Sequence, residues 1–89
     1  MSDETQNQDQ DHGLSELVQY IAEALVDDPR TVSVKSVESD NAVIIELHVS
    51  KEDVGKVIGK GGQTAKALRK ILSAAATKHK KKSMLSIIE

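Results

Sequence analysis

The 89-residue chain has no cysteine, one proline and a single aromatic residue, Tyr20. Without cysteine it can form neither a disulfide framework nor a cysteine-ligated metal site, and a reducing cytosol is allowed. Without Phe or Trp it lacks the platform on which RRM and OB-type modules stack nucleic-acid bases. Any hold on a nucleic acid must therefore come from the backbone, from cations and from aliphatic side chains.

The chain also lacks an apolar run of membrane-spanning length, and its N-terminal stretch has no apolar signal region. We therefore expect a cytoplasmic protein with no membrane partner. The length suits one small domain of limited stability. Residues 1–13 are polar and acidic, too poor in apolar surface to offset their ordering entropy. We predict a disordered acidic tail at 1–13 and a folded domain at 14–89.

The net charge is only −2, but the two signs separate along the chain. Residues 1–30 carry eight acidic residues against one arginine, a net charge of −7. Residues 51–89 carry ten basic residues against three acidic ones, a net charge of +7. The local field decides what a surface attracts, and this asymmetry points to nucleic-acid binding. The tail is either a solubilising segment or a competitor for the basic region.

The first helix is predicted over residues 14–27, where apolar residues recur at helical spacing. The residue before Pro29 disfavours helix geometry, so the helix should end there. Tyr20 falls off the stripe and is expected to pack at the helix border. The stripe expected to be buried consists of Leu14, Leu17, Val18, Ile21, Ala22 and Leu25.

Two β-rich segments, 31–38 and 42–49, flank the turn residues 39–41 and predict an antiparallel hairpin. The second segment alternates, so Ile44 and His48 lie on the face opposite its buried residues. Ile44 is interpreted as a groove or interface residue. His48 has no partner at ligand spacing, so we interpret it as ordinary polarity and predict no metal site.

Two helices and a strand are predicted to complete the chain. Ser50 is expected to cap a short helix, which carries Glu52 and Asp53 in its first turn. A last strand at 83–88 follows a basic linker, in a register that leaves either Met84 and Ile88 or Leu85 and Ile87 facing the helices. The intervening helix, 63–78, is expected to bury Ala65, Leu68, Ile71, Leu72 and Ala75.

The turn Gly59-Lys60-Gly61-Gly62 separates these two helices and organises the chain. Glycine tolerates positive φ and leaves the backbone open to another molecule. The next helix offers unpaired amides with partial positive charge, which together with nearby cations make a phosphate site. The residues predicted to bind are Lys56, Ile58, Gly59, Lys60, Gly61, Gly62, Lys66, Arg69 and Lys70.

The run from Val57 to Arg69, Val-Ile-Gly-Lys-Gly-Gly-Gln-Thr-Ala-Lys-Ala-Leu-Arg, resembles the GXXG signature of the KH domain. With the first helix, it is similar to the small bacterial single-KH RNA-binding proteins of the KhpA type, over roughly residues 14–88. The resemblance implies an α+β fold of the type II KH arrangement, order α-β-β-α-α-β, with helices on one face of a three-stranded mixed sheet. Ala65 stands where many KH domains carry Ile.

The resemblance further implies that the GXXG loop clamps single-stranded RNA. Lys60 would add positive charge to the loop, and Gly61 would add conformational freedom. Ile58 would lie on an apolar groove that receives the bases. Val57, Ala65 and Leu68 would line this groove or belong to the core. It also implies a role in post-transcriptional regulation or RNA chaperoning, touching growth, division and cell shape. Expected partners are a second copy or a larger KH-containing RNA-binding protein, as homodimer or heterodimer.

Two other functions were weighed against RNA binding. An enzyme is disfavoured because the glycines match neither the P-loop nor the dinucleotide pattern, and no nucleophile–base pair stands out. We expect no cofactor and no small-molecule substrate. The stronger alternative is a protein-interaction module that uses a KH scaffold to dimerise, with Tyr20 and Ile44 as exposed apolar groups. The glycine turn with its cations favours RNA, because a purely structural scaffold does not need it.

Overall fold

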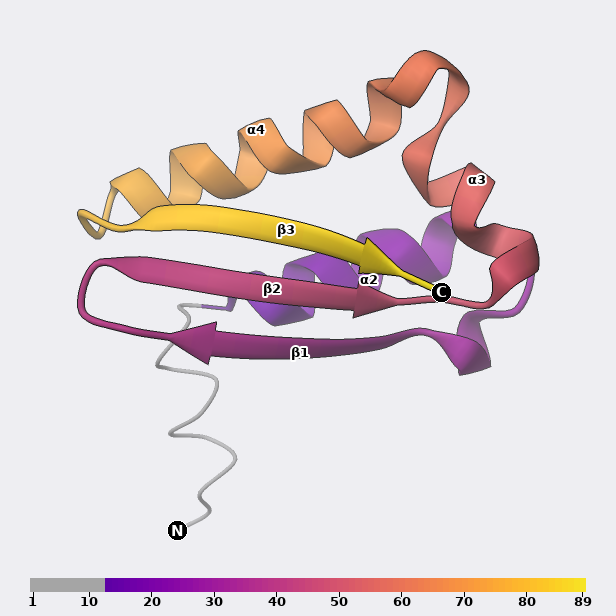
Figure 1. Ribbon diagram of the computed structural model, residues 1–89, viewed down its shortest axis with the longest axis horizontal. Coiled ribbons are helices and arrows are strands. Elements are labelled where there is room, and N and C mark those ends of the chain that lie inside the picture. Colours follow the sequence, from indigo (N-terminus) through magenta and orange to yellow (C-terminus); the bar gives the residue numbers. More distant parts are fainter. Residues whose placement is uncertain (1–12) are drawn as a thin grey trace, which may run out of the picture.

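The computed structural model describes residues 13–89, which fold as three helices against one sheet (Figure 1). The expected disorder of 1–13 lies outside the described residues except for Gly13. The order α-β-β-α-α-β and the α+β class are confirmed. The helices are α2 (Leu14–Leu25), α3 (Val54–Ile58) and α4 (Gln63–Thr77); the strands are β1 (Ser33–Glu38), β2 (Ala42–His48) and β3 (Lys82–Ile88); and short 3-10 turns span Pro29–Thr31, Lys51–Asp53 and Lys60–Gly62.

The sheet is mixed, in the order β1-β2-β3. The hairpin pairs β1 with β2 antiparallel, as predicted, and sets Val37 opposite Ile44. The crossover through α3 and α4 brings β3 parallel to β2 and sets Met84 beside Ile44. The strand β3 thus forms an edge of the sheet, next to α4 (Figure 1).

The core lies between the helices and one face of the sheet. Ile45 and Leu47 of β2 are fully buried there, because alternate residues of a strand point to the same face. The register of β3 is the second of the two predicted: Leu85 is buried and Ile87 packs against the core, whereas Met84 is 60% exposed. On the open face of the sheet, Val37, Ile44 and Met84 form an exposed apolar row.

Some predicted buried positions were wrong. Ile71 is 46% exposed, because within residues 13–89 α4 packs mainly on β3 and the neighbouring helices and leaves this flank largely uncovered. Leu17 and Leu25 lie at the edge of the α2 stripe and are exposed rather than buried. Tyr20 does not pack at the helix border: it is 74% exposed.

The predicted element boundaries shift by one or two residues. Helix α2 ends at Leu25, before Asp27, and α4 ends at Thr77. Thr31 belongs to the 3-10 turn that starts at Pro29, so β1 begins only at Ser33. Ser50 does not cap the helix; its hydroxyl donates to the carboxylate of Asp53 instead.

The turn after α4 has the hydrogen bonds of a Schellman motif. The Lys80 amide donates to the Thr77 carbonyl at 2.9 Å and the Lys81 amide to the Ala76 carbonyl at 3.0 Å. Lys80 takes φ 59° in this motif, at the position where glycine is usual. The side chain of Lys81 forms an ion pair with Glu38, and both are mostly buried.

We predict that Lys80→Gly stabilises the fold. A left-handed residue with a Cβ costs about 1–2 kcal/mol, and glycine's extra unfolded-state entropy offsets about 0.5–1 kcal/mol of this gain. Thermal unfolding should show a melting temperature higher by a few degrees. Lys78→Gly is the matched control: it removes the same charge at φ −57° and should lower stability. A lower melting temperature for Lys80→Gly would contradict the prediction.

Candidate nucleic-acid interface

The loop between α3 and α4 places three glycines at positive φ: Gly59 at 81°, Gly61 at 63° and Gly62 at 76°. Gly59 ends α3, since its amide donates to the Gly55 carbonyl at 2.9 Å. A Cβ on Gly59 would lie 2.2 Å from the hydroxyl oxygen of Thr64 and 2.9 Å from its amide nitrogen. Gly59 is therefore required by close packing as well as by its backbone conformation.

Gly61 and Gly62 differ from Gly59 because no atom lies within 4 Å of the Cβ positions built on them. The space in front of these two residues is open to another molecule. Gly62 precedes α4 and gives this 15-residue helix no side-chain cap. The amide of Gln63, the first residue of α4, donates to the Lys60 carbonyl, and the amides that follow it have no cap from Gly62. Uncapped amides and the positive end of the helix dipole favour an anion here.

The predicted cations distribute over the loop and α4. Lys60 is exposed within the loop, and Lys66 and Lys70 are exposed one turn apart on the helix. These three form no ion pair within residues 13–89. They therefore present charge to solvent beside the uncapped helix end.

Lys56 is turned toward the protein. Its ammonium lies 3.2 Å from a carboxylate oxygen of Asp27 and 3.7 Å from one of Asp53. The hydrogen bond and the charge of Asp27 raise the pKa of Lys56, with a further contribution from Asp53. Lys56 therefore links α3 to the segment after α2, a role that its sequence position did not predict.

Asp53 is the one buried charged residue in residues 13–89, at 2% exposure. Its carboxylate accepts the amides of Asp27 and Asp28 at 3.3 Å and the Ser50 hydroxyl at 3.2 Å. Burial works to raise the pKa of Asp53, but these hydrogen bonds and Lys56 together outweigh it and hold the pKa below 3.8. The carboxylate thus fixes the start of α3, and with it the approach to the glycine loop.

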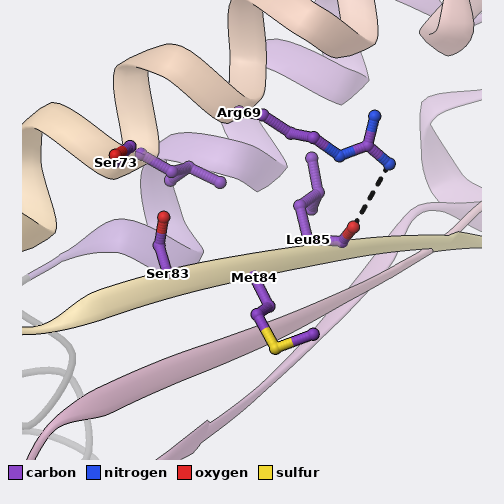
Figure 2. A pocket seen from close by; sticks show the side chains of 6 residues that line it. Arg69, Ser73, Ser83, Met84 and Leu85 are labelled. Atoms are coloured by element: carbon purple, nitrogen blue, oxygen red, sulfur yellow. Dashed lines mark hydrogen bonds between the residues drawn. The ribbon is translucent and has the colours of Figure 1, made fainter.

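A cavity of about 370 Å³ lies between α4 and β3 (Figure 2). The guanidinium of Arg69, one of the lining groups, donates to the Leu85 carbonyl at 3.3 Å. That carbonyl faces α4, since it lies on the edge of β3 away from β2. The residues that line the cavity are Arg69, Leu72, Ser73, Ser83, Met84 and Leu85.

The structure brings most of the predicted site together. Gly59 to Gly62, Lys60, Lys66, Arg69 and Lys70 all lie on the loop or on α4, and Ile58 is half-buried just before the loop. The proposed groove residues Val57, Ala65 and Leu68 are buried at 0–3% exposure and belong to the interior. Ser73 and Ser83, which line the cavity, were not predicted from the sequence, because their placement on the same cavity depends on the register of β3.

No group of three or more His, Asp or Glu side chains in residues 13–89 is arranged to hold a metal ion. No helix within 13–89 has the length and apolar character needed to cross a membrane.

We predict that Asp53→Asn lowers the melting temperature at pH 7, because the amide removes one acceptor and the attraction to Lys56. The pKa of Asp53 is lowered on folding, so its stabilisation is complete above the ordinary value of 3.8 and is lost as pH falls through the lower folded value. The difference between wild type and variant should therefore shrink in acid. Thermal unfolding across pH 2–7 measures it, with the exposed neighbour Glu52→Gln as control. A gap independent of pH would refute this role.

Comparison with known proteins gives a consistent result. The family model for the KhpA/KhpB KH domain matches residues 15–87. A protein of Clostridium perfringens named RNA-binding protein KhpA is 51% identical over 84% of this chain and 100% of its own length. A protein of the same name in Halalkalibacterium halodurans is 52% identical over 82% of this chain and 96% of its own length. Another in Treponema pallidum is 49% identical over 83% of this chain and 92% of its own length. No solved structure matches the chain.

Proposed function

Because this chain belongs to the KhpA/KhpB KH-domain family, we propose that it binds single-stranded RNA with the loop from Gly59 to Gly62. RNA binding is the function stated in the relatives' names, which are not names of enzymes. KH domains clamp about four nucleotides by the backbone with a GXXG loop. The proposal is a cytoplasmic, post-transcriptional role based on binding, without a chemical reaction.

The observation that carries this proposal is the loop geometry. Gly61 and Gly62 combine positive φ with open space, so a phosphate can approach the Gly61 amide and the loop backbone without meeting a side chain. The Gly62 amide itself donates to the Gly59 carbonyl at 3.0 Å. The uncapped start of α4 supplies further donors at the same place. Lys60 is the exposed cation within reach of such a phosphate, and Lys66 and Lys70 extend the positive surface along the helix.

The bases would lie toward the cavity between α4 and β3. Leu72 and Leu85 give this cavity an apolar wall, and Ser73 and Ser83 give it hydroxyl groups. Arg69 holds the Leu85 carbonyl, which is a hydrogen-bond acceptor on the free edge of β3. A base that enters competes with Arg69 for this carbonyl, and the released guanidinium can then contact the RNA.

We predict that Lys60→Asp/Gly61→Asp weakens single-stranded RNA binding by about tenfold or more, because it places two carboxylates where phosphates bind. Aspartate tolerates the positive φ of residue 61 better than most residues, so the variant should fold. Fluorescence anisotropy across salt concentrations measures the affinity, with circular dichroism to check folding. The wild-type log–log salt slope should be about −0.7 per phosphate contacted.

Ser33→Asp/Lys35→Asp is the matched control, with the same change in net charge on exposed positions of β1. It should retain most of the affinity, because both residues lie on the face of the sheet without helices. Equal binding by the folded loop variant and wild type would place the RNA site elsewhere.

Self-association is a second candidate function, favoured by the row of Val37, Ile44 and Met84 on the open face of the sheet. These side chains are 62%, 37% and 60% exposed, and each lies beside the next across the strands. One patch can pair with its own copy about a two-fold axis. We therefore propose a homodimer through this row; a larger KH-containing protein is the alternative occupant.

Ile44→Asp tests this interface, because a carboxylate in the middle of the row opposes burial. The wild type should sediment with a concentration-dependent mass, and the variant as a monomer. Ile71→Asp is the control, since Ile71 is a similarly exposed isoleucine on α4. If only the Ile71 variant is monomeric, the dimer forms through α4 and not through the sheet.

A further inference from the structure

Helix α4 and the turn after it carry four exposed lysines, which we call the α4 cation band. None of the four forms an ion pair within residues 13–89, whereas Lys81, which follows them, is paired with Glu38. The band continues the positive surface of the glycine loop to the far end of the helix. Its members are Lys66, Lys70, Lys78 and Lys80.

We propose that the acidic N-terminal segment, residues 1–12, binds the α4 cation band and competes there with RNA. Its regulatory part rests on the proposed RNA function; the docking itself does not. The segment holds Asp3, Glu4, Asp9 and Asp11 and no lysine or arginine, a net charge of −4. The segment is negatively charged, the band is positively charged, and both belong to the same chain. The segment is therefore a ligand that is always near the band.

The segment joins the domain at a suitable place. The end of α2 is held near α3, because Asp53 binds the amides of Asp27 and Asp28. The start of α2 therefore lies in the opposite half of the molecule, where α4 ends and the hairpin turns (Figure 1). The Lys82 amide, which donates to the Asn41 carbonyl, marks this end.

The segment is also long enough. Twelve residues span at most about 40 Å when fully extended. The longest dimension of the molecule is 35 Å. The carboxylates can therefore reach the nearby Lys78 and Lys80 as well as Lys66, which lies one helix length away. Attachment to the same chain also gives the segment a high effective concentration, of millimolar order.

A relative carries the KH domain without this segment. The family model begins its match at residue 15. The 75-residue match to the Clostridium perfringens protein takes in 100% of that protein, so the remaining residues of this chain have no counterpart there. The acidic segment thus extends a domain that the Clostridium perfringens protein carries without it.

Docking can be measured without RNA. Since the chain has no cysteine, Ser2→Cys gives one site for a nitroxide spin label. At low salt, the label should broaden the amide NMR signals of Lys66 to Lys82 more than those of β1. The broadening should fade at 0.5 M salt, where screening is nearly complete over a few ångströms. Uniform or absent broadening overturns the docking.

The matched control neutralises the segment in the full-length chain with Asp3→Asn, Glu4→Gln, Asp9→Asn and Asp11→Asn. The amide side chains are close in size to the carboxylates that they replace, and the number of residues is unchanged. The variant should therefore lose the broadening if charge holds the segment on the band. Broadening that survives neutralisation overturns the electrostatic mechanism.

Competition is measured by RNA affinity. The neutralised chain should bind single-stranded RNA about threefold to tenfold more tightly than wild type at low salt, and equally at 0.5 M salt. Unchanged affinity with RNA bound by both proteins overturns the competition. If neither protein binds RNA, the proposed function fails together with the competition, and the spin-label result still decides the docking.

Discussion

The contact between Gly59 and Thr64 determines how α3 and α4 meet. The Cβ position of Gly59 would lie within 3 Å of both the side chain and the amide nitrogen of Thr64. The first turn of α4 therefore packs directly on the backbone that ends α3, and only glycine permits this approach. The same turn leads into α4, whose start has no side-chain cap. Loop, helix end and cations thus follow from one close backbone contact.

Two lysines next to this turn differ in their ion pairs, which separates a structural charge from one that the proposed RNA site can use. Lys56 reaches Asp27 and Asp53, and together they join α3 to the end of α2. Lys60, four residues later, has no such partner in the described chain and remains exposed. The buried carboxylate of Asp53 needs its hydrogen-bond donors, because a buried charge without them is unstable. A phosphate site instead needs cations that have no carboxylate partner within the protein, so that they can pair with the phosphate.

The sequence predicted the features that depend on local patterns. The hairpin and the glycine turn follow from alternation and composition, and both are present as expected. The register of β3 did not follow, because apolar residues at 84, 85, 87 and 88 suit both faces equally. The packing of the helices decides it by burying Leu85 and leaving Met84 in solvent. The cavity beside β3 depends on that register. The sequence alone therefore could not predict that Ser73 and Ser83 line it.

The wrong assignments share one cause. Periodicity shows which residues lie on one face of a helix, but how wide a stripe is covered depends on the neighbours. Ile71 lies at the edge of a stripe, outside the main contacts of α4 with β3 and the neighbouring helices in residues 13–89, and it remains exposed. Ser50 carries a cap signal, yet its hydroxyl binds Asp53, whose position is set by amides 25 residues earlier. Such long-range competition is not visible in a local motif.

The scarcity of aromatic side chains shapes the binding chemistry. Tyr20, the single aromatic residue, lies on α2, away from the glycine loop. The proposed site therefore relies on amides, cations and the apolar cavity, and not on stacking of bases on Phe, Tyr or Trp side chains. Binding of this kind depends strongly on salt and on local charge density. Carboxylates on the same chain can therefore lower the RNA affinity of such a surface by reducing its local positive charge. No residue that contacts the RNA has to change.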